Sequence, residues 1–254
     1  MSIFPTRQIF LEIGPLTIHW YGIMYMIAFL LVLWIVPRIK KYRDVHLSSE
    51  YLSTLLLYGI VGTIVGGRLG YVIFYGADYF GDNPLEIFMV WKGGMSSHGG
   101  IIGVAIAAWI FSKKHAIDIW RLADVLVIPA AIGLAFGRFG NFINQELYGS
   151  VTDLPWAISI PGEMDLRHPT QIYAIIKNLF ITSVCFMHLK KYKKPGTTLG
   201  LFIILYGILR FLIEFIRVET SEGFDIAFMH LTRGQMLTVP LIVIGVWIMR
   251  TKRK

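Results

Sequence analysis

Seven long apolar stretches recur along this chain, and they constrain its fold more than any other feature. An α-helix needs about 20 mostly apolar residues to cross a bilayer, and these stretches approach that length. They are Ile18–Val36, Tyr51–Tyr75, Met95–Phe111, Leu122–Gly140, Thr170–Leu189, Leu199–Ile216 and Gln235–Met249. The pattern predicts an all-α membrane protein, a bundle of about seven transmembrane helices that forms one integral membrane domain over residues 1–254.

The composition supports a lipid environment. Hydrophobic residues make up 55% of the 254 residues and charged residues only 16%. A soluble domain averages roughly 25% charged residues, because solvated side chains must cover its surface. The shortage of charge is therefore typical of a protein whose surroundings are largely apolar.

Positive charge alternates between the ends of the stretches and predicts an orientation. Basic residues gather after the first, third, fifth and last stretches: Arg38, Lys40, Lys41 and Arg43; Lys113, Lys114 and Arg121; Lys190, Lys191, Lys193 and Lys194; and Arg250, Lys252, Arg253 and Lys254. The positive-inside rule makes these clusters cytoplasmic, with the N-terminus outside and the C-terminus inside. Residues 142–168 then form a small outward-facing cap. The net charge of +8 is explained by membrane anchoring, and no nucleic-acid partner is predicted.

Glycines at four-residue intervals indicate close helix packing. Gly62, Gly66 and Gly70 share this spacing, as do Gly99 with Gly103 and Gly133 with Gly137. Such spacing places glycine along one helix face, where two backbones can approach closely.

Ionisable side chains inside the apolar stretches are the strongest indication of function, because each is expensive to hold near the bilayer centre. They are Arg68, His98, Arg138, Lys177, Arg210, Glu214 and Arg217. In the predicted orientation all of them, together with Tyr21, fall toward the outward ends of their helices. The sequence therefore predicts a polar layer that faces the outside.

The arginines of this layer predict an anion site. Glu214 lies four residues after Arg210 and three before Arg217, so it can pair with both. At least one arginine then lacks a counter-ion, and an arginine fork suits a phosphate such as a phospholipid headgroup. For Arg68 and Arg217 the alternative is simple snorkelling to the outer headgroups.

Two of the arginines have polar neighbours at helical spacing. Arg138, Asn141 and Gln145 form an i, i+3, i+7 stripe, and Tyr206 lies one turn before Arg210. These neighbours favour a built site over snorkelling at both arginines.

Two sequence runs near these charges carry a family resemblance. Residues 98–103 read HGGIIG, and residues 137–146 read GRFGNFINQE. They resemble the HGGxIG and GRxGNFxNxE motifs of the prolipoprotein diacylglyceryl transferase family, the second at every fixed position. Shorter matches follow the family's order along the chain, at residues 19–22, 66–71, 167–171, 206–217 and 234–235. Ala174 departs from the pattern, since many members have an acidic residue there.

The resemblance implies an enzyme of the bacterial inner membrane. Such enzymes transfer the diacylglyceryl group of phosphatidylglycerol to the lipobox cysteine thiol of a prolipoprotein signal peptide and release glycerol phosphate at the outer face. No metal or soluble cofactor is expected, because the chemistry needs only leaving-group stabilisation and a deprotonated thiol. The single cysteine, Cys185, lies within an apolar stretch and excludes a cysteine-based metal site.

The resemblance also implies catalytic roles. Arg138 and Arg210 are expected to bind the phosphate and offset its growing charge. His98 is the candidate general base or phosphate donor. Tyr21 is its rival, or a group that orients the headgroup.

Further substrate-binding residues are expected around them. Asn141 and Asn144 would hydrogen-bond the headgroup or fix Arg138, while Glu146 and Glu214 would orient arginines. The remaining candidates are Arg68, Gly99, Gly100, Gly140, Tyr206 and Arg217. The three glycines would let lipid approach the backbone closely, or their helices need them for packing.

Two other classes of function compete. A phospholipid or anion transporter would use the same arginine cluster, but the chain has no convincing internal repeat. An intramembrane protease is suggested only by Ser96 and Ser97 next to His98. Adjacency in sequence does not supply the geometry of a Ser–His pair.

Overall fold

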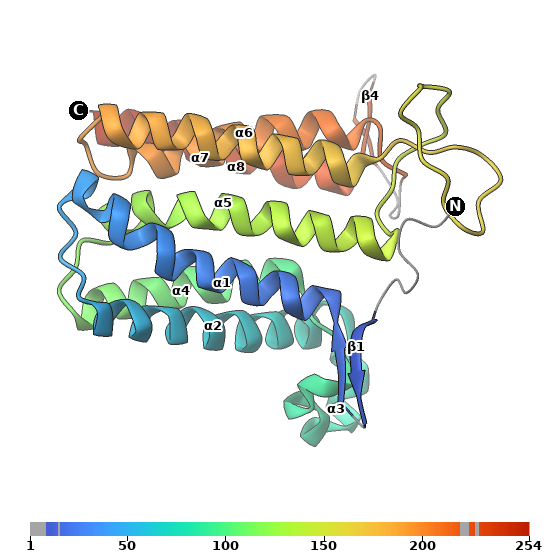
Figure 1. Cartoon of the computed structure of the whole chain (residues 1–254), viewed down its shortest axis with the longest axis horizontal. Helices are drawn as coiled ribbons and strands as arrows, with labels where there is room; N and C mark the ends of the chain where they lie inside the picture. The colour runs from blue at the N-terminus through green and yellow to red at the C-terminus, as the bar shows by residue number, and fades with distance from the viewer. Residues whose placement is uncertain (1–8, 15, 219–223, 227–228, 254) are drawn as a thin grey trace. The chain divides into compact units, whose positions relative to one another are not determined.

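The computed structural model describes residues 9–14, 16–218, 224–226 and 229–253, and helices dominate this part of the chain (Figure 1). The long helices are α1 (Trp20–Ile39), α2 (Ser49–Tyr75), α4 (Ser97–Lys114), α5 (Ile119–Asn144), α6 (Thr170–Lys191), α7 (Thr197–Glu214) and α8 (Arg233–Arg253). Shorter turns of helix are η1 (Lys40–Arg43), α3 (Ala77–Asp82), η2 (Pro84–Phe88) and η3 (Val90–Lys92). Two antiparallel hairpins pair β1 (Ile9–Ile13) with β2 (Leu16–His19) and β3 (Phe224–Ile226) with β4 (Met229–Leu231).

Six helices of the described chain are long and apolar enough to cross a membrane. They are α1 with η1, α2, α5, α6, α7 and residues Gly234–Lys252 of α8. The protein is therefore a multi-pass α-helical membrane protein, as the sequence predicts. The expected third span falls on α4, which is not among the six, so the count of seven and the orientation of the termini stay predictions. Residue 254 of the basic tail lies outside the described residues.

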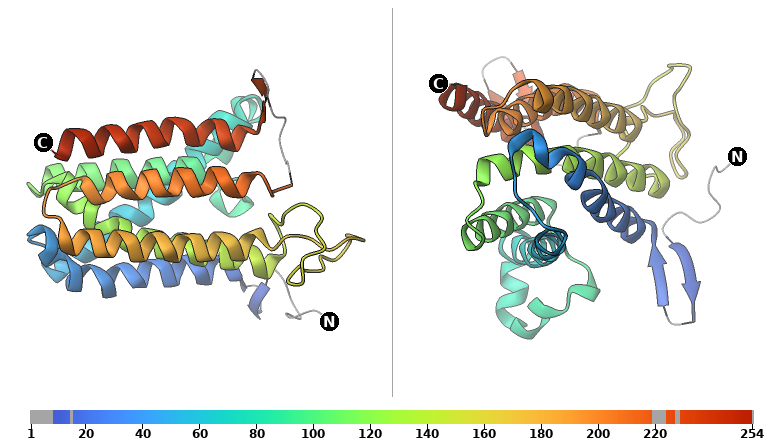
Figure 2. Two further views of the ribbon diagram at one scale, coloured as in Figure 1. Left: turned by 90° about the horizontal axis from the view of Figure 1, so that it is seen from above. Right: turned by 60° about the vertical axis from the view of Figure 1, so that its left-hand side comes forward.

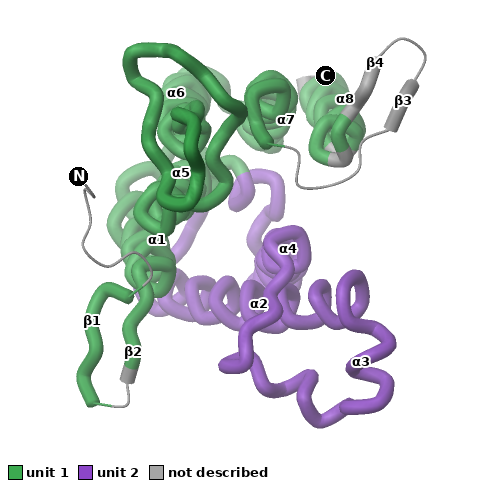
Figure 3. The backbone as a smooth tube through the Cα atoms, turned by 90° about the vertical axis from the view of Figure 1, so that its right-hand side faces the viewer, with its two compact units in different colours: residues 1–43, 124–254 green, residues 44–123 purple. Residues whose placement is uncertain are grey.

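The chain divides into two compact units (Figure 3). Unit 1 comprises residues 1–43 and 124–254, and unit 2 comprises residues 44–123. Within unit 1, α6, α7 and α8 run alongside one another (Figure 2). Unit 2 is built on the pair of helices α2 and α4, with α3, η2 and η3 between them in sequence.

Large apolar side chains lie on the outside of the helices. In α2 they include Leu57 and Ile73, and in α8 they include Val243 and Trp247, all more than half exposed. Apolar faces along whole helices are unfavourable in water but are favourable against lipid tails. This outward distribution agrees with the low charge content of the sequence.

Polar side chains cap the first turns of α2, α4 and α5. The Ser48 hydroxyl accepts from Tyr51 N at 3.1 Å, and the Ser96 hydroxyl accepts from Gly99 N at 3.3 Å. Serine is a preferred N-cap because its side chain satisfies an amide that has no partner inside the helix. Asp118 accepts from the amide of Arg121 at 2.9 Å at the start of α5.

The predicted glycine seam joins α2 to α4. A Cβ added to Gly70 would lie 2.8 Å from Gly99 Cα, and one added to Gly62 would lie 2.9 Å from Ala107 Cβ. No side chain fits at these distances, so the prediction of close backbone packing is confirmed here. The spacing of Gly133 and Gly137 is less informative, because a Cβ on Gly137 would meet nothing within 4 Å.

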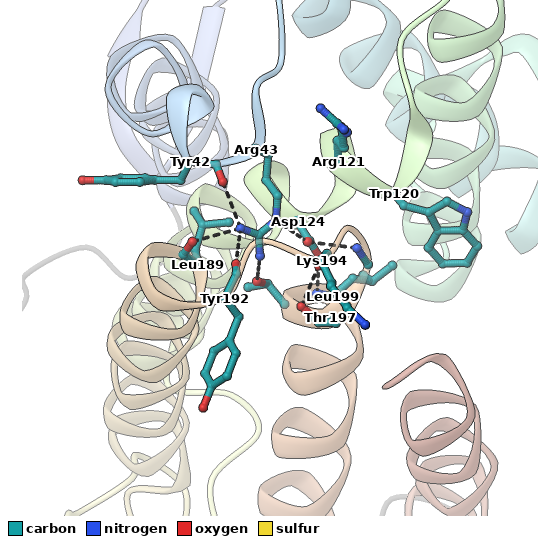
Figure 4. Close-up of polar contacts among 12 residues, drawn as sticks. Tyr42, Arg43, Trp120, Arg121, Asp124, Leu189, Tyr192, Lys194, Thr197 and Leu199 are labelled. Atoms are coloured by element: carbon teal, nitrogen blue, oxygen red, sulfur yellow. Dashed lines mark hydrogen bonds and ion pairs between the residues drawn. The ribbon is translucent and has the colours of Figure 1, made fainter. Parts of the chain in front are cut away.

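A buried ion pair ties unit 1 together at the end where α5 and α7 begin (Figure 4). Arg43 Nε lies 2.6 Å from Asp124 Oδ2, and both side chains are 0% exposed. The other two guanidinium nitrogens of Arg43 also donate: Nη1 to the carbonyls of Tyr42, Leu189 and Tyr192, and Nη2 to the hydroxyl of Thr198. Arg43 is therefore an internal structural group and not the exposed anchor that the sequence predicts.

Candidate functional site

One end of unit 1 collects most of the predicted site residues (Figure 1). Helices α1, α6 and α8 begin at this end, and α5 and α7 finish there. Neighbouring helices run in opposite directions, so residues far apart in sequence meet in one layer. The residues that it brings together are Tyr21, Arg138, Gly140, Asn141, Asn144, Glu146, Tyr206, Arg210, Glu214 and Arg217.

Glu146 is the centre of a hydrogen-bonded group. The Tyr21 hydroxyl donates to its carboxylate and itself accepts from the Asn141 amide. The amides of Asn141 and Asn144 also donate to Glu146 Oε1, each at 3.3 Å. The sequence predicts that Glu146 orients arginines, but the hydrogen-bond partners of its carboxylate among the described residues are the tyrosine and two asparagines.

The end of α5 places Glu146 in this group. Glu146 N donates to Asn141 O and Gln145 N donates to Phe142 O, both at 3.1 Å. These bonds and the φ of +54° at Gln145 form a Schellman motif, which ends a helix by reversing the chain. The reversal turns the Glu146 side chain back over the last turn of α5. It also takes Gln145 off the helix, so the predicted stripe stops at Asn141.

Gly140 makes room for the tyrosine of this group. A Cβ at this position would lie 3.1 Å from the ring atoms of Tyr21. The close approach that the glycine permits is therefore to a protein side chain. A contact between Gly140 and lipid stays a prediction.

Glu214 neutralises one part of an arginine cluster. Its carboxylate pairs with Arg210 one turn earlier and with Arg217 at 3.1 Å, which confirms the pairing expected from spacing. Gly234, at the start of α8, faces this carboxylate, since a Cβ there would lie 2.8 Å from Glu214 Cδ. The sequence carries this glycine only as part of a short motif match, and the structure explains it.

Arg138 differs from its two neighbours. Its Nη1 donates to Asn141 Oδ1 at 3.3 Å, and no carboxylate in the described part of the chain pairs with it. The prediction that at least one arginine has no counter-ion therefore holds for the described residues. A guanidinium has five N–H groups, so Arg138 keeps donors for an anion.

A pocket joins these arginines to helix α6. Its lining residues are Arg138, Leu147, Thr170, Gln171, Ala174, Lys177, Arg210, Ile213 and Arg217. The Lys177 ammonium lies 4.0 Å from the ring centroid of Tyr206. The sequence identifies Lys177 as an ionisable group within a helix but predicts no place for it in the site, and it predicts no role for Gln171.

Residues 145–169 form the segment between α5 and α6, and short hydrogen bonds hold it to the site. Gln171 Nε2 donates to Glu146 O at 2.8 Å, and Thr170 Oγ1 donates to Leu147 O at 2.7 Å. Farther out, the Tyr148 hydroxyl and Arg167 both donate to Glu163. These two hydrogen bonds hold the pKa of the Glu163 carboxyl below its usual range.

Unit 2 carries the other predicted residues. Arg68 is buried and donates to the carbonyls of Ile87, Gly93 and Gly94 at 2.5–3.2 Å and to that of Glu86. Four of its five N–H groups are thus used to hold the segment between α2 and α4, and a headgroup contact of Arg68 stays a prediction.

The HGGIIG run begins α4. His98 is exposed in the first turn. Gly99 and Gly100 are buried, with Gly99 in the seam against α2. Helix packing therefore accounts for Gly99, while substrate roles for all three residues stay predictions. Among the residues that the structure describes, no group of three or more His, Cys, Asp and Glu side chains is placed to hold a metal ion.

Comparison with known proteins agrees with the motifs. The model of the family described as prolipoprotein diacylglyceryl transferase matches residues 8–251. Three relatives carry the name phosphatidylglycerol–prolipoprotein diacylglyceryl transferase. The one from Pseudomonas paraeruginosa is 43% identical over 94% of this chain and 91% of its own length. Those from Pasteurella multocida and Legionella pneumophila are 42% and 40% identical, over 94% and 95% of this chain and 89% and 95% of their own lengths.

Proposed function

Because this chain belongs to the prolipoprotein diacylglyceryl transferase family, we propose that it transfers the diacylglyceryl group of phosphatidylglycerol to a prolipoprotein. The acceptor is the thiol of the lipobox cysteine in the signal peptide. The observation that carries the proposal is the arginine pocket at one end of unit 1, where Arg138 has donors to spare for a phosphate. The phospholipid-transporter alternative is not favoured, since the relatives are named as transferases.

The reaction is a displacement at carbon. The cysteine sulfur attacks the glyceryl carbon that bears the phosphate, a C–S bond forms and the C–O bond breaks. The bonding electrons leave with the phosphate oxygen, so the phosphodiester monoanion becomes a glycerol phosphate monoester with one more negative charge. Arg138 and Arg210 oppose this growing charge, and fixed donors are most effective where charge develops.

The thiol proton needs an acceptor, and two side chains are candidates. His98 in unit 2 is the base predicted from the sequence. The Glu146 carboxylate in unit 1 is the second, because Tyr21 and two asparagines hold it in place. Either base raises the thiolate fraction of a cysteine whose ordinary pKa is about 8.5.

The test is a transfer assay in detergent with purified protein, phosphatidylglycerol and a lipobox peptide, read by mass spectrometry. The expected result is a peptide heavier by one diacylglyceryl group, with glycerol phosphate released. Arg138→Ala should lower kcat about 10²- to 10³-fold, as for other fixed donors to a developing anion. Arg250→Ala, an exposed arginine at the far end of α8, is the matched control. A folded Arg138→Ala protein with near-normal turnover would remove the basis of the proposal.

We place the pocket on the outward side of the bacterial inner membrane. The opposite end of unit 1 carries Lys40, Lys41, Lys190, Lys191, Lys193 and Lys194, which supports a cytoplasmic position for that end. The segment 142–168 is then the outward-facing cap, and residues 1–254 act as one integral membrane domain.

Cysteine labelling tests this orientation. The native Cys185 is buried, so an added cysteine can be read alone. Met164→Cys, at a fully exposed position in the cap, should react with a membrane-impermeant maleimide applied to the outward face. Lys193→Cys should react only after the membrane is opened, and the reverse pattern would invert the topology.

A further inference from the structure

Lys177 adds a cation to the phosphate pocket. It lies in the third turn of α6, is 7% exposed and lines the pocket together with the three arginines. Its ammonium stacks on the Tyr206 ring at 4.0 Å, and no carboxylate in the described ranges is within 4.0 Å of it. A buried ammonium held only by an aromatic face is costly unless an anion joins it.

The charges around the pocket do not balance. The lining includes Arg138, Lys177, Arg210 and Arg217. Two carboxylates lie near these four cations: Glu214 pairs with Arg210 and Arg217, and Glu146 lies across Asn141 from Arg138. The remaining surplus of about two positive charges exceeds what a phosphodiester monoanion supplies. A phosphate monoester carries about 1.5 to 2 negative charges at neutral pH, so it matches this surplus better. The pocket therefore favours the charge that appears as the C–O bond breaks.

Gln171 adds an acceptor next to these cations. Its side chain is 1% exposed and lines the pocket. Nε2 donates to Glu146 O, but the buried Oε1 has no hydrogen-bond partner in the described structure. Buried polar atoms are nearly always paired, so this carbonyl oxygen calls for a donor such as a hydroxyl.

We propose that Lys177 and Gln171 select the headgroup: Lys177 binds the phosphate, and Gln171 Oε1 accepts a hydrogen bond from a hydroxyl of the headgroup glycerol. This rests on the function proposed above and adds a specificity to it. A headgroup with an ammonium, such as phosphoethanolamine, is disfavoured because it would enter a pocket already lined with cations.

Binding of soluble headgroups tests this without any transfer step. Glycerol phosphate, phosphoethanolamine and inorganic phosphate are titrated into the detergent-solubilised protein by calorimetry. Glycerol phosphate should bind about tenfold or more tightly than phosphoethanolamine, and Lys177→Met should weaken it about tenfold or more, as expected for a charged hydrogen bond. Lys190→Met, an exposed lysine over an aromatic ring on the same helix, is the matched control and should bind as the parent does.

A second pair of variants, equal in size and different in charge, separates an effect on binding from an effect on folding. Ala174 lines the pocket one turn before Lys177, so Ala174→Glu places a carboxylate beside the ammonium, while Ala174→Gln has the same size without charge. Weaker glycerol phosphate binding in Ala174→Glu than in Ala174→Gln supports the inference. Equal binding in that pair, or in Lys177→Met and the parent, overturns it. Equal affinity of the parent for glycerol phosphate and inorganic phosphate overturns the role of Gln171. A protein that binds as expected but never modifies the lipobox peptide would instead refute the proposed function.

Discussion

The ion pair between Arg43 and Asp124 gives the sharpest stability prediction. Asp124→Ala removes the acceptor of Arg43 Nε at 2.6 Å, and also that of the backbone amides of Gly196 at 2.9 Å and Leu199 at 2.8 Å. Both side chains of the pair are 0% exposed, so the Arg43 charge lies away from bulk water and lipid headgroups. The variant therefore leaves the buried Arg43 charge and the amides of Gly196 and Leu199 without this carboxylate.

The expected magnitude follows from the burial. Removing one partner of a buried pair destabilises a protein by about 3–5 kcal/mol. Each kcal/mol lowers Tm by about 2–4 °C in a chain of this size, so Tm should fall by about 6–20 °C. Thermal unfolding in one detergent, followed by tryptophan fluorescence, measures this difference. The double variant Arg43→Met with Asp124→Leu should recover part of the loss, because it removes the uncompensated charge.

A measurement of transfer activity separates the loss of stability in Asp124→Ala from any effect on the reaction. Asp124 and Asn141 are about 26 Å apart along the axis of α5, at 1.5 Å per residue. Transfer measured well below Tm should therefore stay within a few fold of the parent rate. Asp153→Ala, an exposed aspartate in the cap, is the control and should leave Tm unchanged. A fall of less than about 2 °C in Asp124→Ala, or a double variant as unstable as the single one, would refute the reasoning.

Three further outcomes follow from the site. Tyr21→Phe removes the hydroxyl that donates to the central carboxylate, and kcat should fall about 10²- to 10⁴-fold with little change in KM, in steady-state transfer kinetics. Gly234→Ala places a methyl 2.8 Å from Glu214 Cδ, at the far end of a flexible side chain, so the carboxylate should shift relative to its arginines. Tm should stay close to that of the parent while kcat/KM falls severalfold in the transfer assay, and an unchanged kcat/KM would show that this position of the carboxylate does not matter for the reaction. The Tyr148 hydrogen bond lowers the pKa of Glu163, so the stability that this carboxylate gives the cap is present above about pH 4.3 and lost as pH falls through the lowered folded-state pKa. Limited proteolysis should show the cap becoming easier to cleave as pH falls across that range, and in Glu163→Gln the cleavage rate should depend less on pH.

The sequence predicts those parts of the fold that depend on local composition. Span lengths follow from apolar runs, and the α2–α4 seam follows from glycines four residues apart, because both are properties of a single helix. The pairing of Glu214 with Arg210 and Arg217 is predictable for the same reason. Helix α4 is where this prediction is weakest, since its 18 residues include three glycines and it is not among the six apolar spans.

Contacts between distant residues could not be predicted in this way. Tyr21 and Glu146 are separated by 125 positions, and Arg43 and Asp124 by 81. Asp124 is a single acid in a long apolar run, so its burial and its partner depend on how the helices of unit 1 pack. The αL turn at Gln145 also could not be predicted from hydrophobic periodicity, because a helical pattern does not indicate where the backbone reverses.

The described part of unit 1 contains two cationic sites with opposite characters. At one, the Arg43 guanidinium meets Asp124, three carbonyl oxygens and a hydroxyl, which is how a protein stabilises a buried charge for folding alone. At the other, Arg138 has one amide oxygen and Lys177 has one aromatic face within the described residues. A site shaped only by stability would supply carboxylates or carbonyls there too, as the same unit does elsewhere. The missing partners therefore mark the place of a substrate anion, and an anion bound there should raise Tm by an amount that grows with the logarithm of its concentration divided by its Kd.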